Sequence, residues 1–358
     1  MIDYKILDLF CGAGGLSEGF KNAKFEIYGA VDFDKAAMKT HLLNFETKFH
    51  FTGDISNISD ETIVRDLSNI DGVIGGPPCQ GFSSANRYLK DEDDPRNRLF
   101  FEFIRFVRII KPKFFLIENV PGILTRDGGF AKDRILEITS SIGYNVSHST
   151  LNSVDYGVPQ IRKRAFFIGV SKNYSNSFYF NQISKSSETY TVGDAIGDLI
   201  DLENNSLSQF NKGSFKLEGY YKSLNKNKIY NHEVTIHNQN VIDRIKHVPQ
   251  GGNWRNVPDH LWNNQRDNRH SSAYRRLSMN YPSITIDTGH MNYFHPIFNR
   301  VPTVRESARI QSFKDDFIFT GTKTEQYRQV GNAVPPLMAE KIAEAIKKIL
   351  VGDNLENN

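Results

Sequence analysis

Residues 71–87 read DGVIGGPPCQGFSSANR, and this stretch decides how the fold of the chain is interpreted. The apolar residues 73–74 are typical of the end of a buried strand, and the two glycines that follow stop it. Because proline fixes its own φ and restricts the residue before it, Pro77 and Pro78 present Cys79 in a narrow range of directions. This arrangement suits a nucleophile, although the turn alone is equally compatible with an ordinary buried cysteine.

The composition is that of an ordinary globular protein with a substantial core. The 358 residues are 39% hydrophobic and 12% aromatic, which allows one large domain with an insertion or two domains. A net charge of +3 is too small to indicate nucleic-acid binding unless basic residues cluster locally. The two cysteines, Cys11 and Cys79, are too few for a disulfide framework or a cysteine zinc site, and they fit a reducing cytoplasm.

No stretch of the sequence predicts a membrane segment or a targeting signal. No apolar run approaches the ~18 residues that a helix needs to cross a bilayer. A strand-like segment begins almost at the first residue, so we expect no signal peptide. We therefore expect a cytoplasmic protein that does not bind membranes.

The first half of the sequence alternates between strand-like and helix-like segments. Apolar runs that indicate buried strands occupy residues 5–10, 26–31, 49–51, 72–74 and 114–117. Residues 99–110 have the clearest helical periodicity, and apolar runs at 146–151 and 165–170 would extend the sheet. Regular alternation of strand and helix predicts an α/β fold with a mostly parallel, doubly wound sheet covered on both faces.

Polar residues recur where the apolar runs end. They are Asp8, Asp32, Asp54, Cys79 and Glu118. A single acidic residue at a strand end is more often a helix cap than a ligand contact. In a doubly wound sheet, however, ligands bind outside the carboxyl ends of the strands, so five such residues predict one shared crevice.

The character of the sequence changes after residue 170. Residues 171–300 are rich in Asn, Ser, Lys, Tyr and His and have weak periodicity, which predicts an inserted smaller domain of irregular and β structure. Beyond residue 300 the pattern sharpens and ends in an amphipathic helix predicted over 336–350. We place residues 1–186 and 326–358 in one domain and residues 187–325 in the other.

A glycine-rich loop follows the first predicted strand. Residues 8–20 read DLFCGAGGLSEGF, and glycines between a strand and a helix let the backbone approach a ligand closely. Asp32 follows Gly12 by twenty residues, as expected for a carboxylate that binds ribose hydroxyls. The competing class is a dinucleotide-binding oxidoreductase, whose GxGxxG pattern needs glycine where this chain has Ser17. The loop alone leaves both classes open.

Six short motifs occur in order along the chain. They are DLFCGAGG (8–15), GPPCQGFS (76–83), LIENV (116–120), QIRKR (160–164), RVPTVRESARIQSF (300–313) and QVGNAVPP (329–336). Together they resemble the DNA (cytosine-5) methyltransferases of the bacterial restriction–modification type, over nearly the whole chain except about residues 171–299. Pro302 and Lys314 depart from the family pattern, which usually has leucine and proline there, and they concern local turn geometry rather than catalysis.

The resemblance implies a Rossmann-like class I methyltransferase fold with an inserted target-recognition domain. The implied activity is transfer of a methyl group from S-adenosylmethionine to carbon 5 of a cytosine flipped out of a short, specific duplex sequence. We expect double-stranded DNA as the partner and a monomer acting on it. We also expect a separately encoded restriction endonuclease, from which the enzyme protects host DNA.

The chemistry explains the catalytic residues that the resemblance assigns. Carbon 5 of cytosine is a poor nucleophile until a thiolate adds to carbon 6, and Cys79 is the expected thiolate. Glu118, if protonated in a water-poor pocket, would hydrogen-bond to nitrogen 3, where negative charge develops. Arg164 is assigned to the carbonyl oxygen at position 2, and Arg162 to support of the loop or of Glu118. For QIRKR alone, a solvated basic strand end is the alternative.

The resemblance also assigns the residues that hold S-adenosylmethionine. Phe10 would pack against adenine, Asp32 would bind the ribose, and Asp54 would accept a hydrogen bond from the adenine amino group. The full expected set is Phe10, Gly12, Gly14, Gly15, Asp32, Asp54, Ile55, Pro78, Leu99, Asn332 and Val334.

A cytosine inside a duplex cannot be reached, so the target base must be flipped out. The polar loop over residues 80–98 is interpreted as a mobile lid, with a solvated surface loop as the alternative, and its expected DNA contacts are Gln80, Ser83 and Arg96. Arg275 and Arg276 are the expected readers of base edges. The histidines lack metal-ligand spacing, so we expect no metal.

Two other functions remain open at this point. One is the same chemistry on tRNA, against which the large variable domain argues. The other is a DNA-binding protein that keeps the fold but not the activity, against which the intact set of Cys79, Glu118 and Arg164 argues.

Overall fold

The structure is a computed structural model, which describes residues 4–79, 97–202, 216–221, 229–262, 273–289 and 292–356. The chain divides into two compact units. The first unit comprises Met1–Asn152, Lys163–Lys185 and Pro336–Asn358, and the second comprises Ser153–Arg162 and Ser186–Pro335. Residues 153–162 and 326–335 therefore group with the second unit, whereas the sequence placed them with the first. The catalytic and target-recognition roles of the two parts stay predictions.

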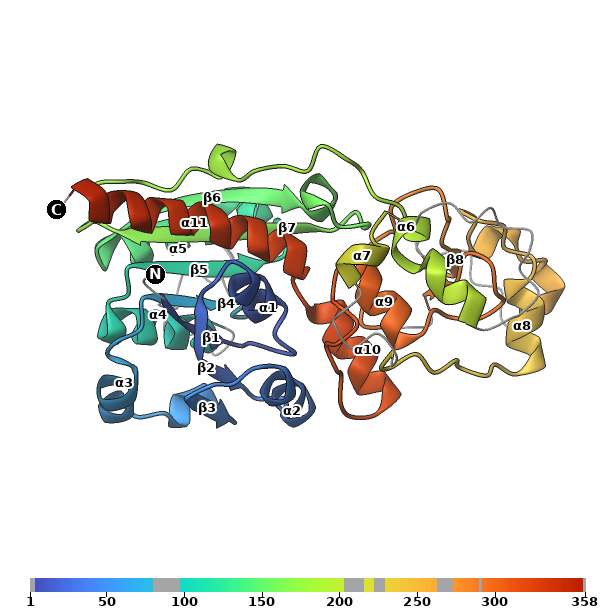
Figure 1. Ribbon diagram of the computed structural model, residues 1–358, viewed down its shortest axis with the longest axis horizontal. Coiled ribbons are helices and arrows are strands. Elements are labelled where there is room, and N and C mark those ends of the chain that lie inside the picture. Colours follow the sequence, from blue (N-terminus) through green and yellow to red (C-terminus); the bar gives the residue numbers. More distant parts are fainter. Residues whose placement is uncertain are drawn as a thin grey trace. The chain divides into compact units, whose positions relative to one another are not determined.

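The first unit is built on a seven-stranded sheet with the strand order β3-β2-β1-β4-β5-β7-β6 (Figure 1). The strands are β1 (Lys5–Leu9), β2 (Glu26–Asp32), β3 (Phe49–Thr52), β4 (Gly72–Gly75), β5 (Phe114–Asn119), β6 (Tyr144–Asn152) and β7 (Lys163–Ser171). Strands β1 to β5 pair in parallel, whereas β7 is antiparallel to both β5 and β6. The predicted mostly parallel, doubly wound sheet is thus confirmed. The strand order reverses between β1 and β4, and ligands of such sheets bind at the carboxyl ends beside a reversal of this kind.

Helices cover both faces of this sheet. The helices of the first unit are α1 (Gly15–Asn22), α2 (Lys35–Asn44), η1 (Ile55–Asn57), α3 (Asp60–Leu67), α4 (Arg98–Ile110), η4 (Pro121–Leu124), η5 (Arg126–Gly129), α5 (Phe130–Ser141), η7 (Phe180–Gln182) and α11 (Pro336–Glu356). Phe114 of β5 stacks on Phe20 of α1, whereas the next residue, Phe115, contacts Phe103 of α4. Successive strand residues point to opposite faces, so α1 and α4 lie on opposite sides of the sheet.

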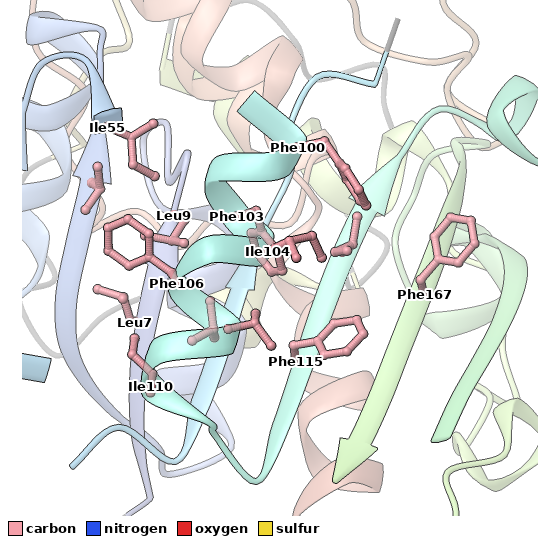
Figure 2. Close-up of a cluster of buried hydrophobic side chains, with 14 of the residues drawn as sticks. Leu7, Leu9, Ile55, Phe100, Phe103, Ile104, Phe106, Ile110, Phe115 and Phe167 are labelled. Carbon is pink, nitrogen blue, oxygen red and sulfur yellow. The ribbon is translucent and has the colours of Figure 1, made fainter. Parts of the chain in front are cut away.

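Helix α4 forms because its apolar residues recur at helical spacing, and they bury one face of it (Figure 2). Phe103 and Phe106 are fully buried against the sheet, together with Leu7 of β1 and Phe115 of β5. The helix ends at Ile110, as predicted. Helix α11 instead runs past the predicted end at residue 350 to residue 356 and packs against α1.

The second unit has little regular structure, as its composition predicted. Its helices and strands are η6 (Ser153–Tyr156), α6 (Val192–Ile196), η8 (Gly197–Leu202), α7 (Glu218–Tyr221), α8 (Gln239–Ile245), η9 (Trp254–Asn256), η10 (Asp259–Leu261), β8 (Arg275–Arg276), β9 (Tyr293–Phe294), α9 (Val304–Ile310) and α10 (Lys323–Asn332). Within its described residues, sheet pairing between named strands is limited to β8 with β9. Short helices therefore supply more of its regular structure than the predicted β content does.

Buried arginines satisfy much of the polar interior of the second unit. Arg305 is completely buried and donates to the backbone oxygens of Tyr230, Lys314 and Phe317. Arg309 is also completely buried and forms a two-pronged ion pair with Asp315. These guanidiniums replace, as donors, the backbone N–H groups that a sheet would provide.

Candidate active site

The turn after β4 brings a cysteine next to a glutamate on the neighbouring strand. Gly75 and Gly76 make this approach possible, because a Cβ atom on Gly76 would lie 3.0 Å from Oε2 of Glu118. A Cβ atom on Gly75 would collide with the carbonyl oxygen of Leu9 on β1. Gly75 is therefore required by the close spacing of β1 and β4, and Gly76 leaves room for the Glu118 carboxylate on β5. Cys79 follows the two glycines after two prolines.

Cys79 is buried, with 4% of its surface exposed. Its Sγ lies 3.3 Å from the carbonyl oxygen of Pro77, to which the thiol donates. Burial, and to a smaller extent the charge of Glu118, raise the pKa of Cys79 to about 12, while a hydrogen bond with Asn119 acts in the opposite direction. In this state the residue is a protonated thiol at neutral pH, which packs on the core of the first unit.

Glu118 and Arg164 form an ion pair at the end of β5 and the beginning of β7. Arg164 Nε lies 3.0 Å from Glu118 Oε1, and both side chains are largely buried. Adjacent pairing of β5 with β7 explains the contact, since Glu118 is opposite Phe166 and Arg164 lies two residues earlier on β7. The fold therefore brings together Cys79, Glu118 and Arg164, three of the four predicted catalytic residues.

Asn119 has a role in this arrangement that the sequence did not reveal. Its side-chain amide donates to the carbonyl oxygen of Pro77 over 3.0 Å and so ties the end of β5 to the Pro-Pro-Cys turn. Its side-chain oxygen accepts from the backbone N–H of Val120 at 2.9 Å, which fixes the orientation of the amide. An amide directly after the strand-end glutamate is the signal that could have identified it.

Arg162, the fourth predicted catalytic residue, belongs to the second unit and has 1% of its surface exposed. Its guanidinium donates to the carbonyl oxygens of Ile286 at 3.1 Å and Gly331 at 2.8 Å. These bonds tie Arg162 to the segment around Ile286 and to the last turn of α10, both in the second unit. The two arginines of one five-residue motif thus have different partners.

The glycine-rich loop between β1 and α1 has the backbone conformation that its composition predicted. Gly12 and Gly14 have positive φ values of 54° and 101°, and Phe10 adopts φ 60°, which is uncommon for a residue with a side chain. A Cβ atom on Gly14 would lie 2.5 Å from the Phe45 ring. At Gly12, in contrast, a Cβ atom would meet nothing within 4 Å. The loop therefore leaves open space beside Gly12, and Gly15 begins α1.

Asp32, at the end of β2, is held against this loop. Its Oδ2 accepts from the backbone N–H of Gly12 and its Oδ1 from that of Asp34, both at 2.7 Å. Burial raises the pKa of Asp32, while these two hydrogen bonds oppose the shift. The next residue, Phe33, has 77% of its surface exposed although it is a large apolar side chain. The sequence did not single out Phe33; its signal is an aromatic residue directly after the strand-end carboxylate.

Asp8, the first of the five strand-end polar residues, does not face outward. It is completely buried, and Ser17 Oγ donates to its carboxylate over 2.6 Å. Ser17 also lies 3.0 Å from Nε2 of the buried His41. Asp8 thus belongs to a polar network beneath the glycine loop. Its side chain accepts from a residue of α1, so Asp8 does not contribute to the expected crevice, and the convergence of the other four residues stays a prediction.

Asp54 caps the short helix η1, which follows β3. Its Oδ1 accepts from the backbone N–H and the hydroxyl of Ser56, and its Oδ2 accepts from Arg98. The hydrogen bonds from Ser56 and then that from Arg98 lower the pKa of Asp54. Ile55 beside it is buried in the core of the first unit, and Leu99 packs on the edge of that core.

The other predicted cofactor residues divide between the units. Pro78 is exposed in the turn of the first unit. Asn332 is exposed at the end of α10, and Val334 is buried, both in the second unit. Their part in one cofactor site with the glycine loop stays a prediction.

The predicted DNA-contacting residues have different outcomes. Gln80, Ser83 and Arg96 lie outside the described residues. Arg275, at β8, is partly exposed. Arg276 has 5% of its surface exposed. Its five N–H groups donate to the carbonyl oxygens of Ile245, Val248, His295 and Phe298 and to the side chain of Asn299. A guanidinium has five donors in all, so this network gives Arg276 a structural role and leaves no donor for a base edge.

Metal-binding clusters and membrane-spanning helices are both absent from the described part of the chain. Among its residues, no group of three or more His, Cys, Asp or Glu side chains is placed to hold a metal ion. No helix over these same ranges has the length and apolar character to cross a membrane.

Comparison with known proteins places the chain in a family. The family described as C-5 cytosine-specific DNA methylase matches residues 4–348. The chain is 38% identical to the type II methyltransferase M.DdeI of Desulfomicrobium norvegicum, a match that covers 99% of this chain and 91% of that one. It is 39% identical to the type II methyltransferase M1.HphI of Haemophilus parahaemolyticus, over 96% and 86% of the two chains.

A solved structure agrees with these relatives. A DNA modification methyltransferase encoded within a prophage of E. coli superimposes with a TM-score of 0.74 at 30% identity, over 98% of this chain and 100% of that one. Together with the match to nearly the full length, this likeness leaves one assignment: the chain belongs to the family of C-5 cytosine-specific DNA methylases.

Proposed function

We propose that this DNA methyltransferase methylates carbon 5 of a cytosine that has been flipped out of a short, specific duplex sequence, through a covalent bond between Cys79 and carbon 6. The observation that carries the proposal is the arrangement at the ends of three adjacent strands. There Cys79 follows β4, Glu118 is the penultimate residue of β5, and Arg164 pairs with Glu118 from β7. A nucleophile next to an acid and a guanidinium is the set that addition to a pyrimidine ring requires.

The proposed chemistry begins at the Cys79 sulfur. Cys79 gives its proton to water and its Sγ bonds to carbon 6, which moves ring electrons toward nitrogen 3 and makes carbon 5 nucleophilic. Glu118 in its protonated form donates to nitrogen 3, and Arg164 donates to the oxygen at position 2, so both stabilise the negative charge that develops on the ring. After carbon 5 is methylated, loss of its proton expels the Cys79 thiolate and restores the ring. Covalent catalysis thereby divides one difficult step into two easier ones.

The residues around the glycine loop fit S-adenosylmethionine as the methyl donor. The open space beside Gly12 admits a ligand against the backbone, and Asp32 is oriented there by the Gly12 N–H. The exposed ring of Phe33 offers an apolar surface next to that carboxylate. When bound, S-adenosylmethionine supplies the electrophilic methyl group. The proposed set comprises Phe10, Gly12, Gly14, Gly15, Asp32, Phe33, Asp54, Ile55, Pro78, Leu99, Asn332 and Val334.

For DNA recognition, we assign the sequence-reading role to the second unit. Arg275 is kept as a contact, together with Gln80, Ser83 and Arg96, whereas Arg276 is assigned to the interior of the second unit. The type II names of the relatives support a place in a restriction–modification system. The enzyme would then protect host DNA from a separately encoded endonuclease and act as a monomer on its site.

Trapping on DNA that contains 5-fluorocytosine tests the mechanism. Fluorine at carbon 5 blocks the final elimination, so the wild-type protein with S-adenosylmethionine should form a stable covalent adduct. Cys79→Ala should form none, and Cys11→Ala, the matched cysteine control, should form it normally. No adduct with the wild type, or equal adduct with Cys79→Ala, would refute the proposed mechanism.

The substrate is tested by sequencing and by competition. Bisulfite sequencing of DNA from a host that expresses the protein should show one short motif uniformly modified. Duplex DNA, but not tRNA, should compete for adduct formation; competition by tRNA alone would reassign the substrate.

A further inference from the structure

Two arginines on one face of α4 bind the loop after β3. Arg98 donates to Asp54 Oδ2 over 2.8 Å and to Ser56 Oγ over 3.4 Å. Arg105 donates to the backbone oxygen of Ile58 over 3.0 Å and to that of Ile55 over 3.4 Å. Residues seven apart lie two helical turns apart on the same face, so both guanidiniums reach the same loop.

The contacts of Asp54 determine how many acceptor sites its carboxylate has left. A carboxylate has about four lone-pair sites, two on each oxygen. On Oδ1, the backbone N–H of Ser56 occupies one site at 3.1 Å and the Ser56 hydroxyl the other at 2.8 Å. On Oδ2, Arg98 occupies one site. Among the described residues, one acceptor site therefore remains, and it lies on the oxygen that Arg98 holds.

Arg105 acts on the backbone next to this carboxylate. Its contact with the Ile55 carbonyl fixes the residue that follows Asp54, and the Ile55 side chain is buried in the core. Arg105 is itself anchored by Glu102 on α4 and by Asp60 at the start of α3. Arg105 thus holds the main chain of the loop, and Arg98 holds Oδ2 of Asp54, the oxygen with the remaining acceptor site.

We propose that Arg98 and Arg105 are positioning residues for the methyl donor: Arg98 aims the remaining acceptor site of Asp54 at the amino group of adenine, and Arg105 sets the position of the loop. This inference rests on the proposed function, in which Asp54 accepts from that amino group. It adds that recognition of adenine, as opposed to a 6-oxo purine, depends on Arg98. A 6-oxo group presents an acceptor to the carboxylate and cannot replace the donor.

If Arg98 only stabilised the fold, its removal should lower the stability of the protein, which differs from the result that a positioning role predicts. The Arg98 side chain is 53% exposed, and exposed ion pairs add little to the stability of a fold. Arg98→Met should therefore keep the thermal stability of the wild type. A loss of ligand discrimination without a loss of stability would be specific to positioning.

The test compares two ligands by calorimetry on the full-length protein. They are S-adenosylhomocysteine and its inosine analogue, which carries an oxygen in place of the amino group. Since a hydrogen bond to a charged group is at stake, the wild type should bind the adenine form roughly 10- to 100-fold more tightly. In Arg98→Met this ratio should fall to about 3-fold or less. Arg105→Met should weaken both ligands about equally and keep the ratio. Arg108→Met, an exposed arginine of the same helix, is the control and should resemble the wild type.

The outcomes separate this inference from the proposed function. A wild type that binds neither ligand counts against the proposed cofactor site itself. A wild type that binds both equally, or an Arg98→Met that keeps the wild-type ratio, overturns the inference while leaving methyl transfer intact. If Arg98→Met does not fold, Arg98→Gln replaces it. A retained wild-type ratio in that variant then overturns the inference, and a ratio of about 3-fold or less supports it.

Discussion

The two units of this protein bury different kinds of side chain. The first is filled by apolar residues around a sheet, such as Phe103 and Phe115, and the sheet itself pairs the backbone groups. In the second, the completely buried side chains include Arg305 and Arg309, whose donors go to backbone oxygens and carboxylates. Where a chain lacks a sheet, its buried carbonyl groups still need donors, and the five N–H groups of a guanidinium supply them.

The largest effect should come from removing one of these guanidiniums. Arg309→Met leaves Asp315 and Asp198 without their shared cation in the interior of the second unit, so the free energy of unfolding should fall by about 3–5 kcal/mol. The chain has two tryptophans, Trp254 and Trp262, and both lie in the second unit. Urea denaturation followed by tryptophan fluorescence therefore reports on this unit.

The matched control is an exposed ion pair of the same unit. Lys216 and Glu188 are 55% and 50% exposed, so Lys216→Met should cost less than about 1 kcal/mol. If Arg309→Met cost as little, the view that buried guanidiniums hold this unit would be wrong.

The second test concerns Asp8, a buried carboxyl group in the otherwise apolar interior of the first unit. Burial raises the pKa of Asp8 to about 7, so the folded state keeps a proton that the unfolded chain releases near pH 4. The stability that this proton contributes is complete below that pH and is lost as the pH rises to 7. Burial lowers the pKa of His41 to about 3, so its contribution is lost as the pH falls and opposes that of Asp8.

Removing the Asp8 carboxyl group should leave the His41 contribution to the pH dependence of stability unopposed. Relative to the wild type, Asp8→Asn should gain stability with rising pH, by up to about 1.4 kcal/mol per pH unit between pH 4 and 7. Urea denaturation at several pH values, followed by far-UV circular dichroism, measures this slope. Asp133→Asn, which removes a 65% exposed carboxylate of the same unit, is the control. An unchanged pH profile in Asp8→Asn would contradict the expectation.

A third, smaller effect tests close packing in the first unit. Gly19 of α1 lies against α11, where an added Cβ atom would collide with Ala339 and the backbone of Glu340. Gly19→Ala should therefore lose about 1–2 kcal/mol, although alanine is the better helix former by about 1 kcal/mol. Gly352→Ala in α11 is the matched control, because its Cβ atom would have only an ordinary contact at 3.9 Å. Thermal melts of both variants decide, and a stabilised Gly19→Ala would disprove tight packing.

The smallest effect should come from a cation that binds carbonyl groups in the first unit. Lys347 Nζ donates to the backbone oxygens of Ala23 and Lys24, just after α1. Lys347→Met should cost about 0.5–1 kcal/mol, since the site is partly exposed and water can replace the ammonium. Lys348→Met, an exposed neighbour, is the reference in thermal melts. If Lys347→Met lowered the free energy of unfolding as much as Arg309→Met, the proposed difference between the two units would be wrong.

Much of the candidate site could be predicted because its residues stand at strand ends. Cys79, Glu118 and Arg164 follow from apolar runs and from motifs, and the sheet brings them together. Asn119 was missed because its bond to Pro77 joins two strand ends that are far apart in sequence. Phe33 was missed because an aromatic residue after a strand-end carboxylate usually indicates burial, and only the structure shows that its ring is exposed.

The strands of the sheet and the turns that carry Cys79 and Gly12 could be predicted from the sequence. These features depend on local rules, namely apolar periodicity and the backbone freedom of glycine and proline. Whether each arginine is buried or exposed depends on contacts that form only in the folded chain. Arg276 resembles any surface arginine in sequence, yet carbonyl groups from residues as distant as Val248 and Phe298 surround it. A charged side chain can be buried only where distant parts of the chain assemble its partners, and no local pattern encodes that meeting.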